Sequence, residues 1–283
     1  MPLIVLIILL ALATALQFIA GDFPVAFFAF PLNVVLLALT MSVVMLLWKY
    51  RRKSGFVRFM LSSAATYIAF GLFLLMVFVI GVTGFRWIIG TWPSVVIILY
   101  FQIVLMFVIM RGWREKTATG ARLGAIRWRF LFLHTGLLIT VMSAFWGQPD
   151  LSESRVKAFR NVPVSEVLME DGSASWITYT LELKSFDVKY GQDGVPSDYS
   201  AELCIDDKNV LLRVNHPYSR TFAEDIYLSG YDVSMGSDSD YVVLQIVKDP
   251  WRYGKTFGII LMIVGVFLLF AGGPRRRYGN EID

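Results

Sequence analysis

Residues 130–147 read FLFLHTGLLITVMSAFWG, and the residues that follow, 148–159, read QPDLSESRVKAF. The first stretch is apolar over most of the length, about 20 residues, that a helix needs to cross the hydrocarbon core of a membrane. The second stretch is polar and charged. This change of composition divides the chain into a membrane part and a water-facing part.

The remainder of the chain is largely as apolar as the first stretch. The 283 residues are 56% hydrophobic and 17% charged, with a mean hydropathy of +0.60, which excludes an ordinary soluble protein. We predict an α-helical membrane protein with about six transmembrane helices, at 3–20, 31–48, 59–82, 94–110, 130–145 and 256–271. Cleavage of the first segment as a signal peptide is disfavoured, because no basic residue precedes it.

Basic residues in short loops predict the orientation. Five Lys or Arg residues follow the second segment, six follow the fourth and three follow the sixth, whereas the opposite short loops carry Arg86 alone. Because basic loops stay in the cytoplasm, both termini are predicted to be cytoplasmic. Seven of the eight tryptophans lie at or near predicted span ends, which is typical of the membrane interface.

These predictions define four parts of the chain: a membrane domain of five helices (1–146), an extracytoplasmic β-rich domain (147–255), a final transmembrane helix (256–272) and a basic cytoplasmic tail (273–283). The β-rich domain carries 11 basic and 18 acidic residues, and the remainder has a net charge of +11. The basic excess therefore belongs to loops beside membrane lipid, and it indicates no nucleic-acid partner.

Alternating apolar and polar residues predict strands at 176–188, 199–205, 210–214, 226–229 and 241–247. Turn residues separate them, and 206–209 is predicted to be a hairpin loop. We expect a small antiparallel sandwich or barrel.

This domain contains no recognisable catalytic constellation. His216 is its only histidine, and no serine lies in a nucleophile-elbow context. The acidic pairs 170–171 and 206–207 are interpreted as solvated turns rather than calcium sites, because no calcium-loop spacing surrounds them. Cys204 is the only cysteine, so its thiol chemistry is limited to another molecule, such as a thiol-disulfide protein. The simpler interpretation of Cys204 is a small strand residue.

Among the His, Asp, Glu, Lys and Arg residues, His134 is the one placed clearly inside a predicted span. Such a group is a functional candidate, because an ionisable side chain in the hydrocarbon core is energetically unfavourable. Imidazole is a common axial ligand of haem iron. The alternative is a histidine that hydrogen-bonds to a neighbouring helix without any cofactor.

The C-terminal half resembles the ResB (CcsB) family of the system II cytochrome c biogenesis pathway. The resemblance rests on five stretches in the expected order: FLFLHTGLLITVMSAFWG (130–147), FDVKYGQDGVPSDYSAEL (186–203), RVNHPY (213–218), IYLSGYD (226–232) and YVVLQIVKDPW (241–251). A final hydrophobic helix follows them.

This resemblance implies a subunit of the membrane cytochrome c synthetase in the bacterial cytoplasmic membrane, a haem lyase complex. The subunit would act with a CcsA-type partner to export haem b and attach it to apocytochrome c, and it would not be an autonomous enzyme. His134 matches a proposed transmembrane haem ligand of the family. Arg127 and Arg129 are then candidates for binding the haem propionates, although the cytoplasmic excess of basic residues also accounts for them.

The sequence departs from the family pattern in three ways. It has six predicted spans where four are usual, its acidic domain is short, and Leu228 stands where a glutamine is expected. The tryptophan-rich haem-handling motif is absent and belongs to the CcsA-type partner. The main alternative function is a membrane-anchored sensor or assembly factor that binds an extracytoplasmic protein without haem. A transporter is less favoured, since a lone histidine offers no charge relay.

Overall fold

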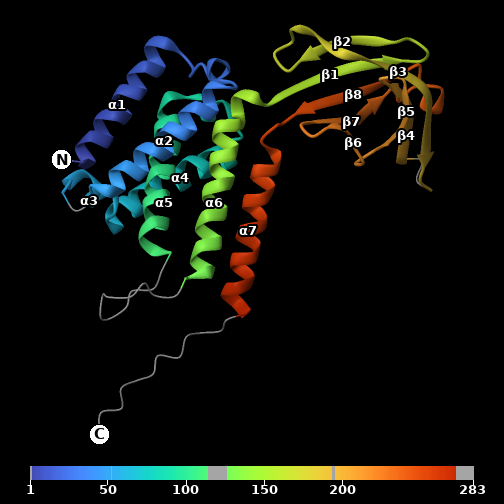
Figure 1. Cartoon of the computed structure of the whole chain (residues 1–283). Coiled ribbons are helices and arrows are strands. Elements are labelled where there is room, and N and C mark those ends of the chain that lie inside the picture. The colour runs from blue at the N-terminus through green and yellow to red at the C-terminus, as the bar shows by residue number, and fades with distance from the viewer. Residues whose placement is uncertain (1, 52, 114–125, 193–194, 272–283) are drawn as a thin grey trace. The chain divides into compact units, whose positions relative to one another are not determined.

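The computed structural model of the chain describes residues 2–51, 53–113, 126–192 and 195–271. The predicted basic tail, 273–283, lies outside the described residues, and so does most of the basic loop after the fourth span. The chain forms two compact units, one made of Met1–Pro149 and the segment from Trp251 onward, the other of Asp150–Pro250 (Figure 1). Each unit is described separately below.

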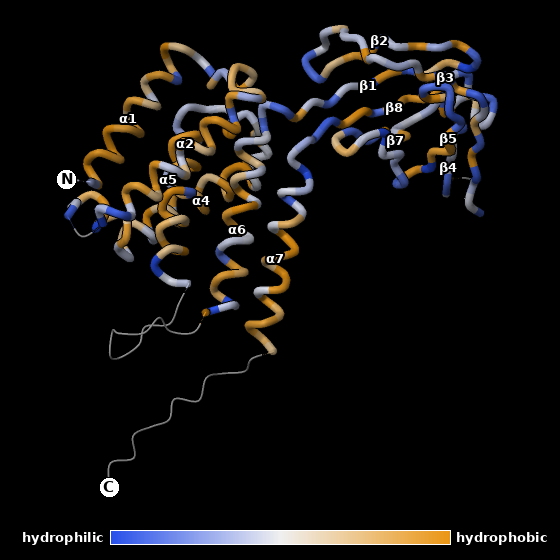
Figure 2. Tube along the Cα trace, in the orientation of Figure 1, coloured by the Kyte–Doolittle hydropathy of each residue, from blue (hydrophilic) through white to orange (hydrophobic). Residues whose placement is uncertain are grey.

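Six helices among the described residues are long and apolar enough to cross a membrane, which confirms the predicted class of fold. They are α1 (Pro2–Ala20), α2 (Leu32–Lys49), α4 (Ser63–Thr83), α5 (Trp92–Gly112), α6 (Trp128–Gly147) and α7 (Arg252–Ala271). Figure 2 shows that hydrophobic residues dominate these helices. A short helix, α3 (Gly55–Met60), and three 3-10 turns, η1 (Val25–Phe28), η2 (Arg86–Gly90) and η3 (Gln148–Asp150), lie between the long elements.

Helix α5 is the centre of the helical unit, because it packs against α1, α2, α4 and α6. Its buried side chains include Phe101 and Phe107. Phe101 stacks on Phe73 of α4, with 4.3 Å between the ring centroids. Close packing of this kind holds membrane helices together, because lipid is as apolar as the side chains and the hydrophobic effect does not favour one helix contact over lipid.

Helices α6 and α7 pack closely through glycines. A Cβ atom added to Gly258 of α7 would lie 2.7 Å from the Gly136 carbonyl oxygen of α6 and 2.7 Å from the backbone nitrogen of Thr140. A Cβ atom on Gly265 would likewise lie 2.8 Å from the backbone nitrogen of Leu133. Small residues therefore let the two backbones approach to contact, as in other tightly packed membrane helix pairs.

The second unit is a single antiparallel sheet of eight strands within the described residues, in the order β5-β4-β3-β2-β1-β8-β7-β6. The strands are β1 (Ser152–Phe159), β2 (Val164–Met169), β3 (Ala174–Tyr190), β4 (Pro196–Ile205), β5 (Lys208–Arg213), β6 (Tyr218–Thr221), β7 (Glu224–Tyr231) and β8 (Tyr241–Lys248). The five predicted strands correspond to β3, β4, β5, β7 and β8, and β1, β2 and β6 are additional. The predicted hairpin loop is a two-residue turn, since Ile205 pairs with Lys208 and both Asp206 and Asp207 have positive φ, as a type I′ turn requires.

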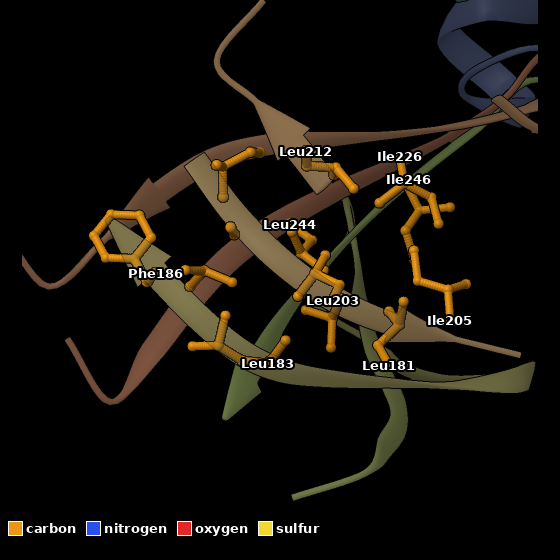
Figure 3. Packing of buried hydrophobic residues seen from close by; sticks show 14 of the residues in the cluster. Leu181, Leu183, Phe186, Leu203, Ile205, Leu212, Ile226, Leu244 and Ile246 are labelled. Atoms are coloured by element: carbon orange, nitrogen blue, oxygen red, sulfur yellow. The ribbon is translucent and has the colours of Figure 1, made fainter. Parts of the chain in front are cut away.

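One face of the sheet carries the hydrophobic core. Side chains from β3, β4, β5, β7 and β8 point toward one another in Figure 3. All the residues labelled there belong to this core: Leu181, Leu183, Phe186, Leu203, Ile205, Leu212, Ile226, Leu244 and Ile246. The alternation of buried and exposed residues follows directly from the two-residue period of a strand. Cys204 lies between two of these core residues on β4 and is half-buried.

A charged network links the β4–β5 turn to the opposite edge of the sheet. Arg220 of the edge strand β6 donates through Nε to Asp206 at 3.1 Å and through Nη1 to Glu224 at 3.2 Å. Its guanidinium group lies 3.8 Å from the ring centroid of Tyr179 on β3. Glu224 also pairs with Lys248 at 3.5 Å. Arg220 therefore joins two ends of a sheet that curls around its core, as the contact between β5 and β7 also indicates.

Burial raises the pKa of the Tyr179 phenol far above its ordinary value, and the nearby Glu224 carboxylate adds to this effect. The phenol is consequently neutral at physiological pH. The guanidinium group thus rests on an uncharged aromatic ring, which is the arrangement of a cation–π contact.

Candidate functional site

His134 lies in the second turn of α6 and is half-buried. Its Nδ1 atom is 2.8 Å from the carbonyl oxygen of Phe130, one turn earlier in the same helix. A carbonyl oxygen can only accept a hydrogen bond, so Nδ1 carries the proton and the lone pair of the neutral ring is on Nε2. This tautomer suits a metal ligand that coordinates through Nε2.

Phe130 also fixes the plane of the imidazole ring. The two rings stack with their centroids 4.0 Å apart and their planes at 27°. Stacking uses a face of the imidazole, and the hydrogen bond uses Nδ1, so neither contact engages the Nε2 lone pair. Phe130 is itself packed against α5, where a Cβ atom on Gly112 would lie 2.5 Å from the tip of its ring.

The structure brings Arg127 to the same place. Arg127 precedes the first turn of α6, and its guanidinium group lies 4.9 Å from the centroid of the Phe130 ring. Its Nη1 atom donates to the carbonyl oxygen of Gly112 at 3.2 Å. Arg127, Phe130 and His134 therefore form a continuous stack against the end of α5.

Arg129 has a different position. It is half-buried in the first turn of α6 and lies five residues before His134, which corresponds to about 140° around a helix of 3.6 residues per turn. Among the two predicted arginines, Arg127 is thus the one on the His134 face. His216, in contrast, is exposed in the segment between β5 and β6, where its backbone pairs with Arg213.

Two buried amides near the other end of the helices were not singled out from the sequence. Asn33 of α2 donates through Nδ2 to the carbonyl oxygen of Trp146 at 2.8 Å. The Trp146 indole donates to Gln102 Oε1 of α5 at 3.1 Å, and both side chains are buried. Trp146, in the last turn of α6, is therefore packed inside the helical unit. Uncharged polar residues within apolar spans, at 33 and 102, were the available sequence signal.

The acidic pairs of the β-rich unit are engaged in turns and ion pairs. Asp171 accepts hydrogen bonds from the Ser173 hydroxyl at 2.6 Å and the Ser173 amide at 2.9 Å, which lower the pKa of its carboxyl group. Asp206 binds Arg220. No group of three or more His, Cys, Asp or Glu residues that could hold a metal ion occurs in the part of the chain that the structure describes.

The fold and the site define a class: an integral membrane protein with a β-rich unit inserted between its last two membrane-crossing helices and a histidine within the helix that precedes the insertion. Residues 110–239 match the model of the ResB-like family, which confirms the resemblance seen in the sequence. The matched region includes all of α6, with Arg127, Arg129 and His134, and strands β1 to β7.

Among solved structures, "Cytochrome c Heme Lyase CcmF" is similar with a TM-score of 0.39 and 12% identity, over 71% of this chain and 33% of that one. The chain thus covers about a third of the length of that protein. The search of curated proteins found no match.

Proposed function

We propose that this protein takes part in cytochrome c biogenesis, as a ResB/CcsB-like subunit of a membrane cytochrome c synthetase that binds haem through His134. The proposal rests on one observation above all: within a region that matches the ResB-like family, His134 is held in the tautomer that exposes a lone pair on Nε2. The Nδ1 proton is bonded within α6, whereas the alternative interpretation calls for a hydrogen bond to a neighbouring helix.

The surroundings of His134 suit haem as a substrate in transit. His134 Nε2 would supply one axial ligand to the iron, and Phe130 fixes the orientation of the imidazole ring. The Arg127 guanidinium has five N–H groups, and the bond to Gly112 uses one of them, so further donors are suited to a propionate. Arg129 remains a candidate for the same role from another side of the helix.

The predicted topology would divide the steps between the two sides of the membrane. If both termini are cytoplasmic, Arg127 and His134 would lie near the cytoplasmic end of α6, where haem would enter. The β-rich unit would then lie outside, where it would position apocytochrome c beside the haem site of a CcsA-type partner. In this arrangement the chain is a non-autonomous subunit of a haem lyase complex.

The test is the Soret spectrum of the full chain, purified in detergent after coexpression with a CcsA-type partner. Wild type is expected to carry haem, and His134→Ala is expected to lose it or to regain the band only with added imidazole. His216→Ala is the matched control, because it removes the same side chain from an exposed position in the other unit and should leave the haem content unchanged.

Equal haem in wild type and His134→Ala would overturn the assignment of the ligand. A well-assembled complex with no haem in any variant would favour the membrane-anchored sensor or assembly factor. In a second comparison, Arg127→Gln and Arg129→Gln should separate the two arginines, with the larger loss of haem in Arg127→Gln.

A further inference from the structure

The helical unit contains a cavity of about 540 Å³ that does not include His134. Its lining comes from α2, α4, α5 and α6, and from the segment before α2, which contributes Phe23, Val25 and Phe28. A concave and largely apolar space of this size falls within the range of small-molecule sites, which makes it a candidate binding site.

Helix α2 lines one wall of the cavity and is buried at only two positions. Asn33 near its start and Val44 further along are the buried residues of this helix, and Asn33 is fixed to α6 by its hydrogen bond to Trp146. The side chains between these two positions that line the cavity are Leu36, Leu39 and Thr40. Between the two buried positions, Leu36 and Leu37 are only partly buried against the helical core, which leaves room for the cavity beside α2.

The polar atoms of the deeper lining have partners in their own helices. Thr40 donates its hydroxyl to the Leu36 carbonyl at 2.8 Å, and Thr140 donates to the Gly136 carbonyl at 2.9 Å. Asn33, at the start of α2, donates to the Trp146 carbonyl of α6, and the remaining lining is aliphatic and aromatic apart from Gln148, which follows the end of α6. An occupant therefore needs an apolar body and no polar group deep in the cavity.

The residues that line the cavity also argue against haem as its occupant. The lining contains no His, Cys, Met, Tyr or Lys, so it offers no side chain of the kinds that normally ligate haem iron. The cavity is also open to its surroundings, because four lining residues are exposed: Leu39, Ile89, Ala144 and Gln148. What surrounds membrane-crossing helices at this depth is lipid.

The depth of the cavity matches one leaflet. Thr40 is eight residues from the start of α2 and Phe73 is ten residues from the end of α4, which places them about 12 Å and about 15 Å from those helix ends. Half of the hydrocarbon core is about 15 Å thick. The cavity therefore extends from the membrane surface toward the midplane.

We propose that this cavity binds one acyl chain of a phospholipid from the leaflet next to the start of α2, with the headgroup at the level of Gln148. The lipid fills the space between α2 and α6 and supports the bundle where α2 makes few contacts of its own. This proposal is independent of haem binding at His134.

The test uses the full chain in vesicles of phosphatidylethanolamine and phosphatidylglycerol that contain a phosphatidylethanolamine with a photoreactive diazirine in one acyl chain. After irradiation, mass spectrometry of peptides should find adducts on Leu36, Leu39 and Val141 of wild type. Ala144→Trp fills the cavity and should lower these adducts about tenfold or more, the effect of about 1.4 kcal/mol of lost binding free energy. Ala38→Trp is the control, because Ala38 is exposed on α2 and lies outside the lining.

Leu39→Trp provides a second filling variant from α2, in case Ala144→Trp does not assemble. Adduct yields that are the same in wild type and in both filling variants would overturn the proposal, since they would report only lipid around the bundle. The same labelling is repeated in membranes that contain the CcsA-type partner. Loss of the adducts on α2 and α6 in those membranes, at an equal amount of the chain, would assign the cavity to a helix of the partner and also overturn the proposal.

Discussion

At the scale of single residues, the buried carboxylate of Glu224 forms two ion pairs within the β-rich unit. Only 4% of its surface is exposed, and its carboxylate binds Arg220 and Lys248. Breaking a buried pair by removing one partner typically costs about 3–5 kcal/mol, because a charge is left in a poorly solvated place. Lys248 would still neutralise part of the charge. We therefore predict that Arg220→Ala lowers the free energy of unfolding of this unit by about 2 kcal/mol.

Hydrogen exchange of the full chain in detergent measures this loss. Amides of β7 and β8 that exchange only through opening of the whole unit should exchange about 30-fold faster in Arg220→Ala. Lys184→Ala is the control, because it removes a cation from an exposed pair with Glu182 and should leave the exchange rates unchanged. Equal rates in Arg220→Ala and wild type would show that the network contributes nothing to the closure of the sheet.

The sequence identified His134 but not the contacts that give it a role. An ionisable residue within an apolar span is visible in any sequence, and the spacing of four residues between Phe130 and His134 places them on one helix face. That Phe130 rests on Gly112 follows only from the packing of α5 against α6. The Asn33–Trp146–Gln102 network was equally unpredictable, since its members come from three different helices.

At the scale of elements, the pairing of α6 with α7 depends on glycine. A methyl group at position 258 would meet backbone atoms of Gly136 and Thr140, which cannot rotate away. Gly258→Ala should force the two helices apart and lower the temperature at which the detergent-solubilised chain loses its monodisperse peak in size-exclusion chromatography. Because His134 lies in α6, the same variant is also expected to weaken haem binding.

Gly71→Ala in α4 is the matched control for this prediction. No atom lies within 4 Å of a Cβ built at Gly71, so the added methyl meets no neighbour and slightly favours the helix. A Gly258→Ala chain as stable as Gly71→Ala would mean that α6 and α7 are not held by close backbone contact.

The elements differ in how well local sequence determines them. Membrane helices were predicted within a few residues because length and hydropathy suffice, yet α6 and α7 begin earlier than expected, with Trp128 and Arg252 included in their first turns. Strands β1, β2 and β6 were not predicted. β6 has only four residues, and the pairing of β2 with β3 shifts register between Val164 and Glu166, so the alternation is interrupted.

At the scale of the whole molecule, the order of the crossings separates the basic segments from the β-rich unit. If all six apolar helices cross, the C-terminal ends of α2, α5 and α7 would lie on one side, and the insertion between α6 and α7 would lie on the other. The basic residues after α2 and α5 then assign the first side to the cytoplasm. The β-rich unit would consequently be extracytoplasmic, as its proposed contact with apocytochrome c requires.

The single cysteine makes this topology directly testable. Cys204 lies in β4 and is only half-buried, so a maleimide can reach its thiol. A membrane-impermeant maleimide, added to cells whose outer membrane is permeabilised and whose cytoplasmic membrane is intact, should label the wild-type chain. In a Cys204→Ser, Lys53→Cys chain, the thiol follows α2 and is exposed, and it should react only after the membrane is opened. Labelling in the reverse pattern would place the β-rich unit in the cytoplasm, on the side where haem is made. The unit could then not position an external apocytochrome, and haem delivery would need a different route.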